Sequence, residues 1–477
     1  MHVYCCRRDD IISSIPLHFA GLDHGGKEFY VTFLPYVAPN YEEVKLFITT
    51  PEQMPVTFTI SAPRMGYFRN ATVDPGGVKE LTFNGANYAL RNTTDRSKGF
   101  IITTENERQI FVYGAQRVPY SMDSFLVLPP HDLGAESYTY MAAMIHTRDR
   151  GNLVGGWKDI HALIGIVSVE DCTHLTITPT RNVTIGAKVV AAGDSINVTL
   201  HRAETLLIPC LGDLTGTKVT SNRPISFFCG DQCPKIPRGV EACDQIVEQL
   251  PPVEAWGKKF ATVPLKTRKS FDVFRIVAAS QGTTVNITCT LRNGDQGYVN
   301  TFHFNEGGFT DVQVKSVHFC WVEADKRILL LQFAIGQARD HVASDPFMAL
   351  VPAVSQYTNV FKLPVVRSSF DHYLNIIIPA EHYQPDQILL DNQSLQSLGH
   401  RFVAIVHNGE TMAYATQVKV RATTHTLRHG NSSGVIGVVA YGFAHGTSYG
   451  HIGGLQLPTH FSKFIRKAVF ILLWILI

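Results

Sequence analysis

Three cysteines lie close together in the middle of the chain and offer two kinds of chemistry. Cys229, Cys233 and Cys243 fall within fifteen residues, beside prolines and a glycine. Thiolates bind zinc, but a structural zinc site needs four ligands, usually in two closely spaced pairs. Three cysteines without a fourth nearby are more typical of a disulfide-held surface loop in a secreted protein. We therefore predict a disulfide here, with Cys233–Cys243 closing a loop of eleven residues, and leave the partner of Cys229 open.

Four more cysteines belong to the same cluster of seven in the middle of the sequence. Cys289 ends one expected hairpin and Cys320 begins the next, so we predict that these two pair. The same reasoning pairs Cys172 with Cys210. Seven cysteines leave one thiol over, so a disulfide-linked oligomer is an open alternative.

Three aspartates recur with a shared spacing and are the other candidates for chemistry. Asp123, Asp244 and Asp345 each precede a proline by six or seven residues. A residue that recurs in every copy of a repeat points to a structural role, so we expect each one to fix the turn that follows. The sequence has no GxGxxG, GxxxxGK[ST] or HExxH motif. We therefore expect no catalytic residue, no cofactor and no metal site, and rank an enzyme on a repeated β fold last.

Composition narrows the class of partner. The chain has 477 residues and a formal net charge of +2, and only 17% of its residues are charged. No Lys/Arg-rich stripe interleaved with aromatic residues appears, so nucleic acid is not an expected partner. Nine cysteines in all are typical of an extracellular protein.

Potential glycosylation sites point to the same compartment. Asn-X-Ser/Thr sequons without a central proline are more numerous than chance predicts in this chain. They begin at Asn70, Asn92, Asn182, Asn197, Asn286, Asn392 and Asn431. We therefore predict a secreted glycoprotein.

The two ends of the sequence do not resemble the core. Residues 1–25 lack the apolar stretch of a signal peptide and are expected to be poorly ordered. Residues 456–477 carry basic residues followed by AVFILLWILI, and ten apolar residues are too few to span a bilayer. A truncated transmembrane helix, a lipid-anchor signal and a read-through product are the open alternatives, so membrane attachment at this end is also open.

A hairpin with a polar turn recurs along the chain. Each copy has two apolar or β-branched runs on either side of a short polar turn, and three copies lead into a proline-containing exit. The copies lie at residues 98–114, 216–230, 319–336 and 431–446. Helix signals are nearly absent, so the sequence predicts a repeated all-β fold.

The repeat divides the chain into four related antiparallel β modules. We expect each module to be a sandwich of two sheets, and the alternative is a four-bladed, propeller-like ring. About 110 residues is long for a single blade, which favours sandwiches. The predicted boundaries are 26–136, 137–257 with the cysteine-rich loop, 258–357 and 358–455.

Several strings resemble the N-terminal IgG Fc-binding domain of the IgG Fc-binding protein family. They include EFYVTFLP, SFLVLPPHDLGAESY, CDQIVEQLPPVEAWG, FRIVAASQGTTVNIT and YGFAHGTSYG, and together they span about residues 26–455. The resemblance implies a secreted, non-enzymatic module of mucus-type or extracellular proteins. It assigns no individual binding residue.

These observations predict an extracellular binding or adhesion module that recognises a protein or glycan through loops on a β scaffold. A structural, oligomer-forming component of mucus or matrix is the alternative. The loop PKIPRGVEA is particular to the second module, so it is our candidate for recognition. Its candidate contacts are Lys235, Ile236, Arg238 and Glu241.

Overall fold

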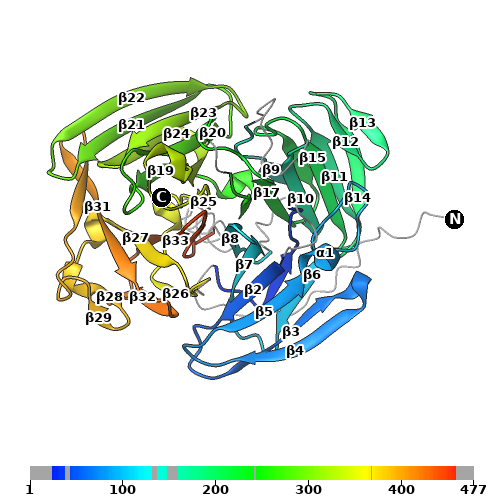
Figure 1. The fold of residues 1–477 in the computed structure, drawn as a ribbon, viewed down its shortest axis with the longest axis horizontal. Helices are drawn as coiled ribbons and strands as arrows, with labels where there is room; N and C mark the ends of the chain where they lie inside the picture. The colour runs from blue at the N-terminus through cyan, green and yellow to red at the C-terminus, as the bar shows by residue number, and fades with distance from the viewer. Residues whose placement is uncertain are drawn as a thin grey trace, which may run out of the picture.

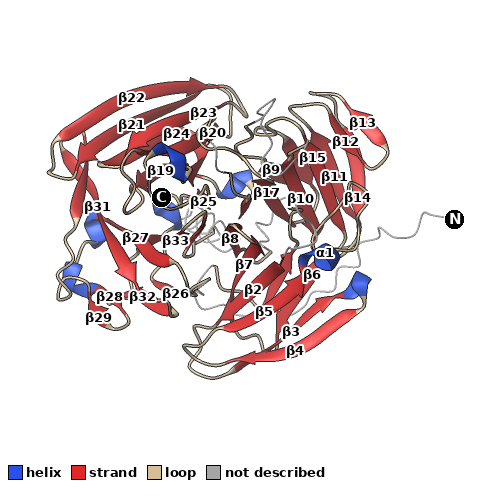
Figure 2. Ribbon diagram, in the orientation of Figure 1, coloured by secondary structure: helices blue, strands red, loops and turns tan. Residues whose placement is uncertain are grey.

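The chain is built almost entirely of antiparallel strands joined by short turns (Figure 2). The computed structural model describes residues 24–37, 43–130, 137–147, 159–240, 243–366 and 368–457. Within them, helix is limited to the single turn α1 (Gly85–Tyr88) and to three-residue 3-10 turns. These turns are η2 (Pro63–Met65), η4 (Val253–Ala255), η5 (Gln337–Arg339), η6 (Val354–Gln356), η7 (Ala380–His382) and η8 (Pro385–Gln387). The predicted all-β class is confirmed.

One arrangement of eight strands recurs four times along the chain, and we call each copy a unit. In the first unit, a flanking sheet has the order β1-β6-β3-β4 and an axial sheet has the order β5-β2-β7-β8. The strands are β1 (Glu28–Val31), β2 (Glu43–Thr49), β3 (Val56–Ala62), β4 (Tyr67–Val73), β5 (Lys79–Asn84), β6 (Phe100–Thr104), β7 (Phe111–Val118) and β8 (Ser121–Val127). Apolar residues of both sheets pack into one core, which makes the unit a sandwich.

The second unit repeats this order and adds a small hairpin, β12-β13. Its flanking sheet is β9-β16-β11-β14 and its axial sheet is β15-β10-β17-β18. The strands are β9 (Tyr138–Met141), β10 (Ala162–Ser168), β11 (Thr173–Thr178), β12 (Val183–Ile185), β13 (Lys188–Val190), β14 (Ile196–Leu200), β15 (Thr205–Cys210), β16 (Lys218–Ser221), β17 (Ile225–Asp231) and β18 (Ile246–Gln249).

The third unit joins its two sheets through one long strand. β24 pairs with β19 and β21 in its first half and with β20 and β25 in its second half. The strands are β19 (Gly257–Thr262), β20 (Phe271–Ala278), β21 (Thr283–Leu291), β22 (Gln296–Phe304), β23 (Phe309–Lys315), β24 (His318–Phe333) and β25 (Met348–Leu350).

The fourth unit has a flanking sheet β26-β32-β28-β29 and an axial sheet β31-β27-β33-β34, with β30 added outside β31. The strands are β26 (Val360–Leu363), β27 (Asp371–Pro379), β28 (Ile388–Leu390), β29 (Gln393–Ser394), β30 (Val403–His407), β31 (Glu410–Val420), β32 (His425–His429), β33 (Gly437–Ala444) and β34 (Thr447–Ile452). Each unit thus has two sheets, as the sandwich prediction requires. Whether the boundaries drawn from the sequence delimit independently folding domains stays a prediction.

The pattern of burial explains how the sheets are layered. β3 alternates buried and partly exposed residues, as expected for a sheet with one face on a core. β8, β10 and β17 are buried along their whole length, so both faces of the axial sheets are covered. One hydrophobic cluster contains residues from all four units, which makes the described fold a single packed body.

The four units are grouped around a common axis (Figure 1). The last strand of each unit lies at this axis, and each of β8, β18, β25 and β34 contacts two of the others. The contact between β34 and β8 closes the ring, because it joins the fourth unit to the first. Tyr113 strengthens this seam by donating a hydrogen bond to the carbonyl oxygen of Gly453 at 2.8 Å.

The beginning of the described chain lies at the same seam. His24 is fully buried, stacks on Phe111 of the first unit and also faces Phe361 of the fourth. Its ring covers Gly454 so closely that a side chain at that glycine would not fit. Burial lowers the pKa of His24 to about 3.

Candidate functional site

The three repeated aspartates meet at the centre of the ring. The carboxylate of Asp123 accepts backbone hydrogen bonds from Val247 at 2.9 Å, from Met348 at 3.3 Å and from Gly450 at 3.3 Å. These three amides belong to β18, β25 and β34. One side chain of the first unit therefore binds the axial strands of the other three units.

Asp244 makes a similar set of contacts from the second unit. Its carboxylate accepts hydrogen bonds from the amide of Met122 at 2.9 Å and from the hydroxyl of Ser121, both in β8. It also accepts one from the amide of Ser448 in β34 at 3.4 Å. The hydroxyl of Ser448 in turn donates to the carbonyl oxygen of Asp345.

Burial raises the pKa of the carboxyl groups in this cluster. Asp123 and Asp244 are fully buried, and loss of water raises the pKa of both carboxyl groups well above the usual range. Burial also raises the pKa of Asp345 to about 7, although the nearby Arg268 partly opposes the shift. Among the described residues, no group of three or more His, Cys, Asp or Glu side chains is arranged to hold a metal ion.

The repeated aspartates therefore have a wider structural role than the sequence suggests. Asp123 and Asp244 do bind the amides of the residues that follow them, Ser124 and Gln245. Their remaining partners, however, lie in other units. The prediction of a local turn-fixing role accounts for only part of what these carboxylates do.

A second polar network joins the second and third units. Arg275 in β20 is almost fully buried and contacts Asp213 at 2.6 Å and Asp311 at 2.7 Å. Nearby, His146 and Asp231 pair at 2.6 Å, also buried. The sequence offers no signal for either contact, because the partners are far apart along the chain.

Part of the loop between Cys233 and Cys243 is buried. Ile236 is 1% exposed and lies in the shared hydrophobic cluster, and its carbonyl oxygen accepts the amide of Gly336 from the third unit. Ile236 is therefore wrong as a candidate contact, because a partner cannot reach a side chain that packs between two units.

The other three candidates in this loop differ in their position. Lys235 is partly buried, and its backbone amide donates to the hydroxyl of Thr147 at 2.6 Å. Arg238 is exposed. Glu241 lies outside the described residues.

Two disulfides are present in the described residues. Cys233–Cys243 closes the loop, and Cys289–Cys320 joins residues that face each other directly on β21 and β24. The predicted Cys172–Cys210 pair is wrong. Cys210 lies opposite Ala162 at one end of β10, whereas Cys172 follows the other end, and neither cysteine is in a disulfide. A disulfide needs Cα atoms within about 7 Å.

All seven sequon asparagines are exposed. Their amide oxygens accept hydrogen bonds, but their Nδ2 atoms, where a glycan would be attached, donate none to the described residues. By contrast, Asn222 and Asn359, which are not in sequons, donate through Nδ2. Among the described residues, an attached sugar would therefore displace no hydrogen bond from these Nδ2 atoms.

Three of these asparagines lie on corresponding strand pairs in successive units. Asn70 and Asn197 lie on the fourth strand of their flanking sheets, and Asn286 lies on the third strand, across the same strand pair. A threonine directly opposite donates to each amide oxygen at 2.8 or 2.9 Å. The repeat thus carries the same polar pair on the exposed face of three flanking sheets.

A cavity of about 810 Å³ opens where the second, third and fourth units meet. Its walls come from η4, β19, the β20–β21 turn, the centre of β24, η6 and η7. Four cations line it, Lys258, Lys259, Lys326 and Arg327, together with the single carboxylate of Glu381. The sequence signal for this site is two separate pairs of adjacent basic residues. Neither pair indicates a binding site by itself, and only the fold brings the two pairs together.

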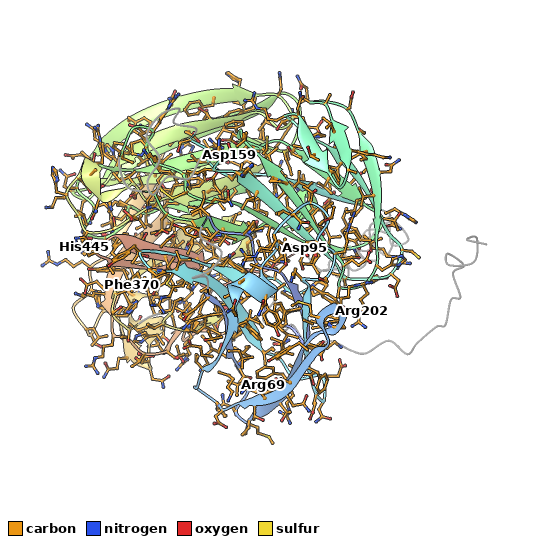
Figure 3. The ribbon with its side chains drawn as sticks, turned by 45° about the vertical axis from the view of Figure 1, so that its right-hand side comes forward. Arg69, Asp95, Asp159, Arg202, Phe370 and His445 are labelled. Carbon is orange, nitrogen blue, oxygen red and sulfur yellow. A yellow bond between two sulfur atoms is a disulfide. The ribbon has the colours of Figure 1, made fainter. Side chains whose placement is uncertain are left out.

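A second cavity, of about 550 Å³, lies between the third and fourth units. Phe370 and His445, on the left in Figure 3, are among its lining residues, as is Asp371. Its walls have no comparable excess of charge. Arg202 of the second unit, on the right in the same figure, donates hydrogen bonds to Tyr30 and Glu28 across the interface between the first and second units.

Comparison with known proteins gives this arrangement a family. The family model described as IgGFc binding protein matches residues 123–442. The chain belongs to the IgGFc-binding protein family. The match begins at Asp123 itself and continues into β33, so it includes the carboxylates at the axis and all four cations of the larger cavity.

A curated member of the IgGFc-binding protein family extends the comparison. The human IgGFc-binding protein is 24% identical to this chain over 337 residues, which are 70% of this chain and 6% of that protein. The chain thus spans only a small part of the length of its relative.

Solved structures add little to the family assignment. A tandem repeat from the extending region of a large adhesion protein is 11% identical, with a TM-score of 0.10, over 90% of this chain and 99% of that chain. A Ca²⁺-stabilised adhesin of an Antarctic bacterium is 9% identical, with a TM-score of 0.13, over 91% of this chain and 99% of that one. Similarity at these values carries no information about this IgGFc-binding family member.

Proposed function

We propose that this chain is an extracellular, non-enzymatic binding module that recognises a protein or glycan partner. The main support for the proposal is the exposure of the sequon asparagines. Seven asparagines are exposed with Nδ2 free of described partners, and such sites are used only in the secretory pathway. Family membership and the two disulfides support the same compartment.

The rigidity of the scaffold supports a binding role. The units share a hydrophobic cluster and are held together by buried carboxylates, so the surface between them is fixed before a partner arrives. Preorganised surfaces bind with a smaller loss of conformational entropy. The name of the human relative states that it binds IgG Fc, which makes an Fc fragment the first protein probe.

The structural alternative, an oligomer linked by disulfides, gains no support from the described thiols. Cys229 is fully buried, and Cys172 and Cys210 are each 9% exposed, so none of the three is accessible to a second chain. Burial also raises the pKa of the Cys210 and Cys229 thiols, which lowers their reactivity. Cys5 and Cys6 lie outside the described residues. So does the apolar tail, and among the described residues no helix is long and apolar enough to cross a bilayer.

The test is expression of the full chain behind a secretion signal in mammalian cells. We expect secreted protein that shifts to lower mass on treatment with peptide N-glycosidase and that shows two protected cysteine pairs by non-reducing peptide mapping. The purified protein is then applied to immobilised human Fc fragment and to a glycan array. A chain that is retained, reduced and without sugar, or that binds nothing on either surface, would overturn the proposal.

A further inference from the structure

We propose that the 810 Å³ cavity binds an acidic oligosaccharide, one that carries sulfate or carboxylate groups. The proposal rests on the proposed function, to which it adds a class of ligand. The volume is within the range of about 300–1,000 Å³ that is common for small-ligand sites.

The charge of the lining points to an anion. Lys258 and Lys326 are held by backbone carbonyl groups, which carry no net charge: Lys258 by Asp325 at 2.6 Å, and Lys326 by Gln281 and Gly282 at 2.7 Å. Their positive charges therefore lack a carboxylate partner in these contacts. Only Lys259 is paired with a carboxylate, that of Glu323 at 3.1 Å.

Arg327 adds a cation that is free to bind a ligand. Its guanidinium group makes no hydrogen bond or ion pair with the described residues, although its backbone carbonyl oxygen accepts the amide of Ala279 at 3.0 Å. A guanidinium group matches the oxygen atoms of a sulfate or carboxylate group in a two-pronged geometry. The cavity thus combines two anchored ammonium groups with one unoccupied guanidinium group.

The backbone explains why these cations gather. The pairing of β19 with β24 shifts in register between Gly257 and Lys259, so that β24 bulges at residues 324–327. A bulge redirects the side chains that it carries and is common beside binding sites. Here it brings Lys326 and Arg327 to the same cavity as Lys258.

An oligosaccharide fits this cavity better than an acidic peptide does. One common way for a protein to bind a peptide is to add it as a strand to an open sheet edge. At β19 that edge is covered by η6, and Ala353, just before η6, packs so closely on Gly257 that no side chain would fit there. The hydroxyl groups of Ser280 and Ser355 line the cavity and suit the hydroxyl groups of a sugar.

The experiment measures binding of two acidic probes and one neutral probe to the secreted full chain by isothermal titration calorimetry. The probes are a heparin-derived tetrasaccharide, sialyllactose and lactose. We expect a sulfated or sialylated probe to bind and lactose not to bind, and the affinity to fall as salt is raised. The two acidic probes distinguish sulfate from carboxylate recognition.

The test variant is Lys326→Glu with Arg327→Glu, and the matched control is Arg69→Glu with Lys188→Glu. The control residues are exposed on β4 and β13, away from the cavity, and give the same change in net charge (Figure 3 labels Arg69). We expect the test variant to bind the acidic probe at least about tenfold more weakly and the control to bind within about twofold of the natural chain. Equal thermal melting temperatures would exclude unfolding as the cause.

A milder second variant tests the same cavity if the double variant does not fold. Arg327→Gln alone changes an exposed side chain with no described partner, so it leaves the fold intact, and we expect several-fold weaker binding. The cavity proposal would be overturned if both cavity variants bound the acidic probe as tightly as the natural chain does. It would also be overturned if the natural chain bound neither acidic probe. Secretion, sugar attachment and capture of an Fc fragment would still support the module, so the two failures are distinguishable.

Discussion

The carboxylate of Asp123 in β8 accepts a hydrogen bond from the backbone amide of Met348 in β25, although 225 residues separate them. The same carboxylate binds amides of β18 and β34. At the axis, where four short strands meet without a continuous ladder between units, a side chain supplies the acceptors that strand pairing would otherwise provide.

Substitution of Asp123 by Asn should destabilise the whole ring. Asn has one acceptor oxygen and places an amide donor against buried backbone donors, so at least one of them loses its partner. We expect a loss of about 3 kcal/mol or more in the free energy of unfolding, measured by urea denaturation.

The control for this substitution is Asp159→Asn at an exposed position (Figure 3). It should change the free energy of unfolding by less than about 0.5 kcal/mol. Equal stability of the two variants would show that the axial hydrogen bonds contribute nothing.

Asp345 should make stability fall as the pH rises. The pKa of this buried carboxyl group is about 7 in the folded protein, whereas an unfolded aspartate titrates near 3.9. Between these values the folded state binds more protons, so this contribution is complete below about pH 4 and is lost as the pH rises to 7. His24 and His451, each with a pKa of about 3, act in the opposite direction below pH 6.5.

A comparison with Asp345→Asn isolates the aspartate from the two histidines. Relative to the natural chain, the variant should gain about 1–3 kcal/mol between pH 5 and pH 8. Urea denaturation at both pH values measures this gain. A difference between the two proteins that does not change with pH would contradict the assignment.

Two residues of the disulfide-closed loop should respond differently to truncation. Ile236→Ala removes a buried side chain and should cost about 2–5 kcal/mol in the free energy of unfolding. Arg238→Ala, at an exposed position of the same loop, should cost less than about 0.5 kcal/mol. Thermal and urea unfolding of both variants would measure the difference. Similar losses would mean that the loop does not belong to the core.

Three asparagines on the flanking sheets should carry sugar in protein from mammalian cells. Release of N-glycans in H₂¹⁸O converts each occupied asparagine to labelled aspartate, which peptide mass spectrometry detects. We expect occupancy at Asn70, Asn197 and Asn286, because each lies exposed on a flanking sheet. Unlabelled asparagine at all three would argue against passage through the secretory pathway.

The repeat, the all-β class and two of the disulfide pairs could be predicted from the sequence. Local patterns suffice for these features, because hairpins and alternation are written in neighbouring residues. The Cys172–Cys210 pair failed because strand register depends on contacts across the sheet. Both cysteines belong to hairpins of one unit, but the register places them at opposite ends of β10.

The candidate binding residues could not be predicted from the sequence around them. Ile236 follows a proline-rich, cysteine-bounded pattern that is typical of a surface loop, yet the third unit covers it. Lys258 and Arg327 belong to no recognisable motif. They line the same cavity because a bulge in β24 turns Arg327 toward it. Only the tertiary arrangement distinguishes the two cases.

The seam at which His24 covers Gly454 has a mechanical consequence. His24 and Gly454 are in contact, so a pulling force applied at these two residues would act across the contact between β34 and β8. Resistance to tension would therefore depend on the few hydrogen bonds of this seam, including those that Asp123 accepts from Gly450 and that Gly453 accepts from Tyr113.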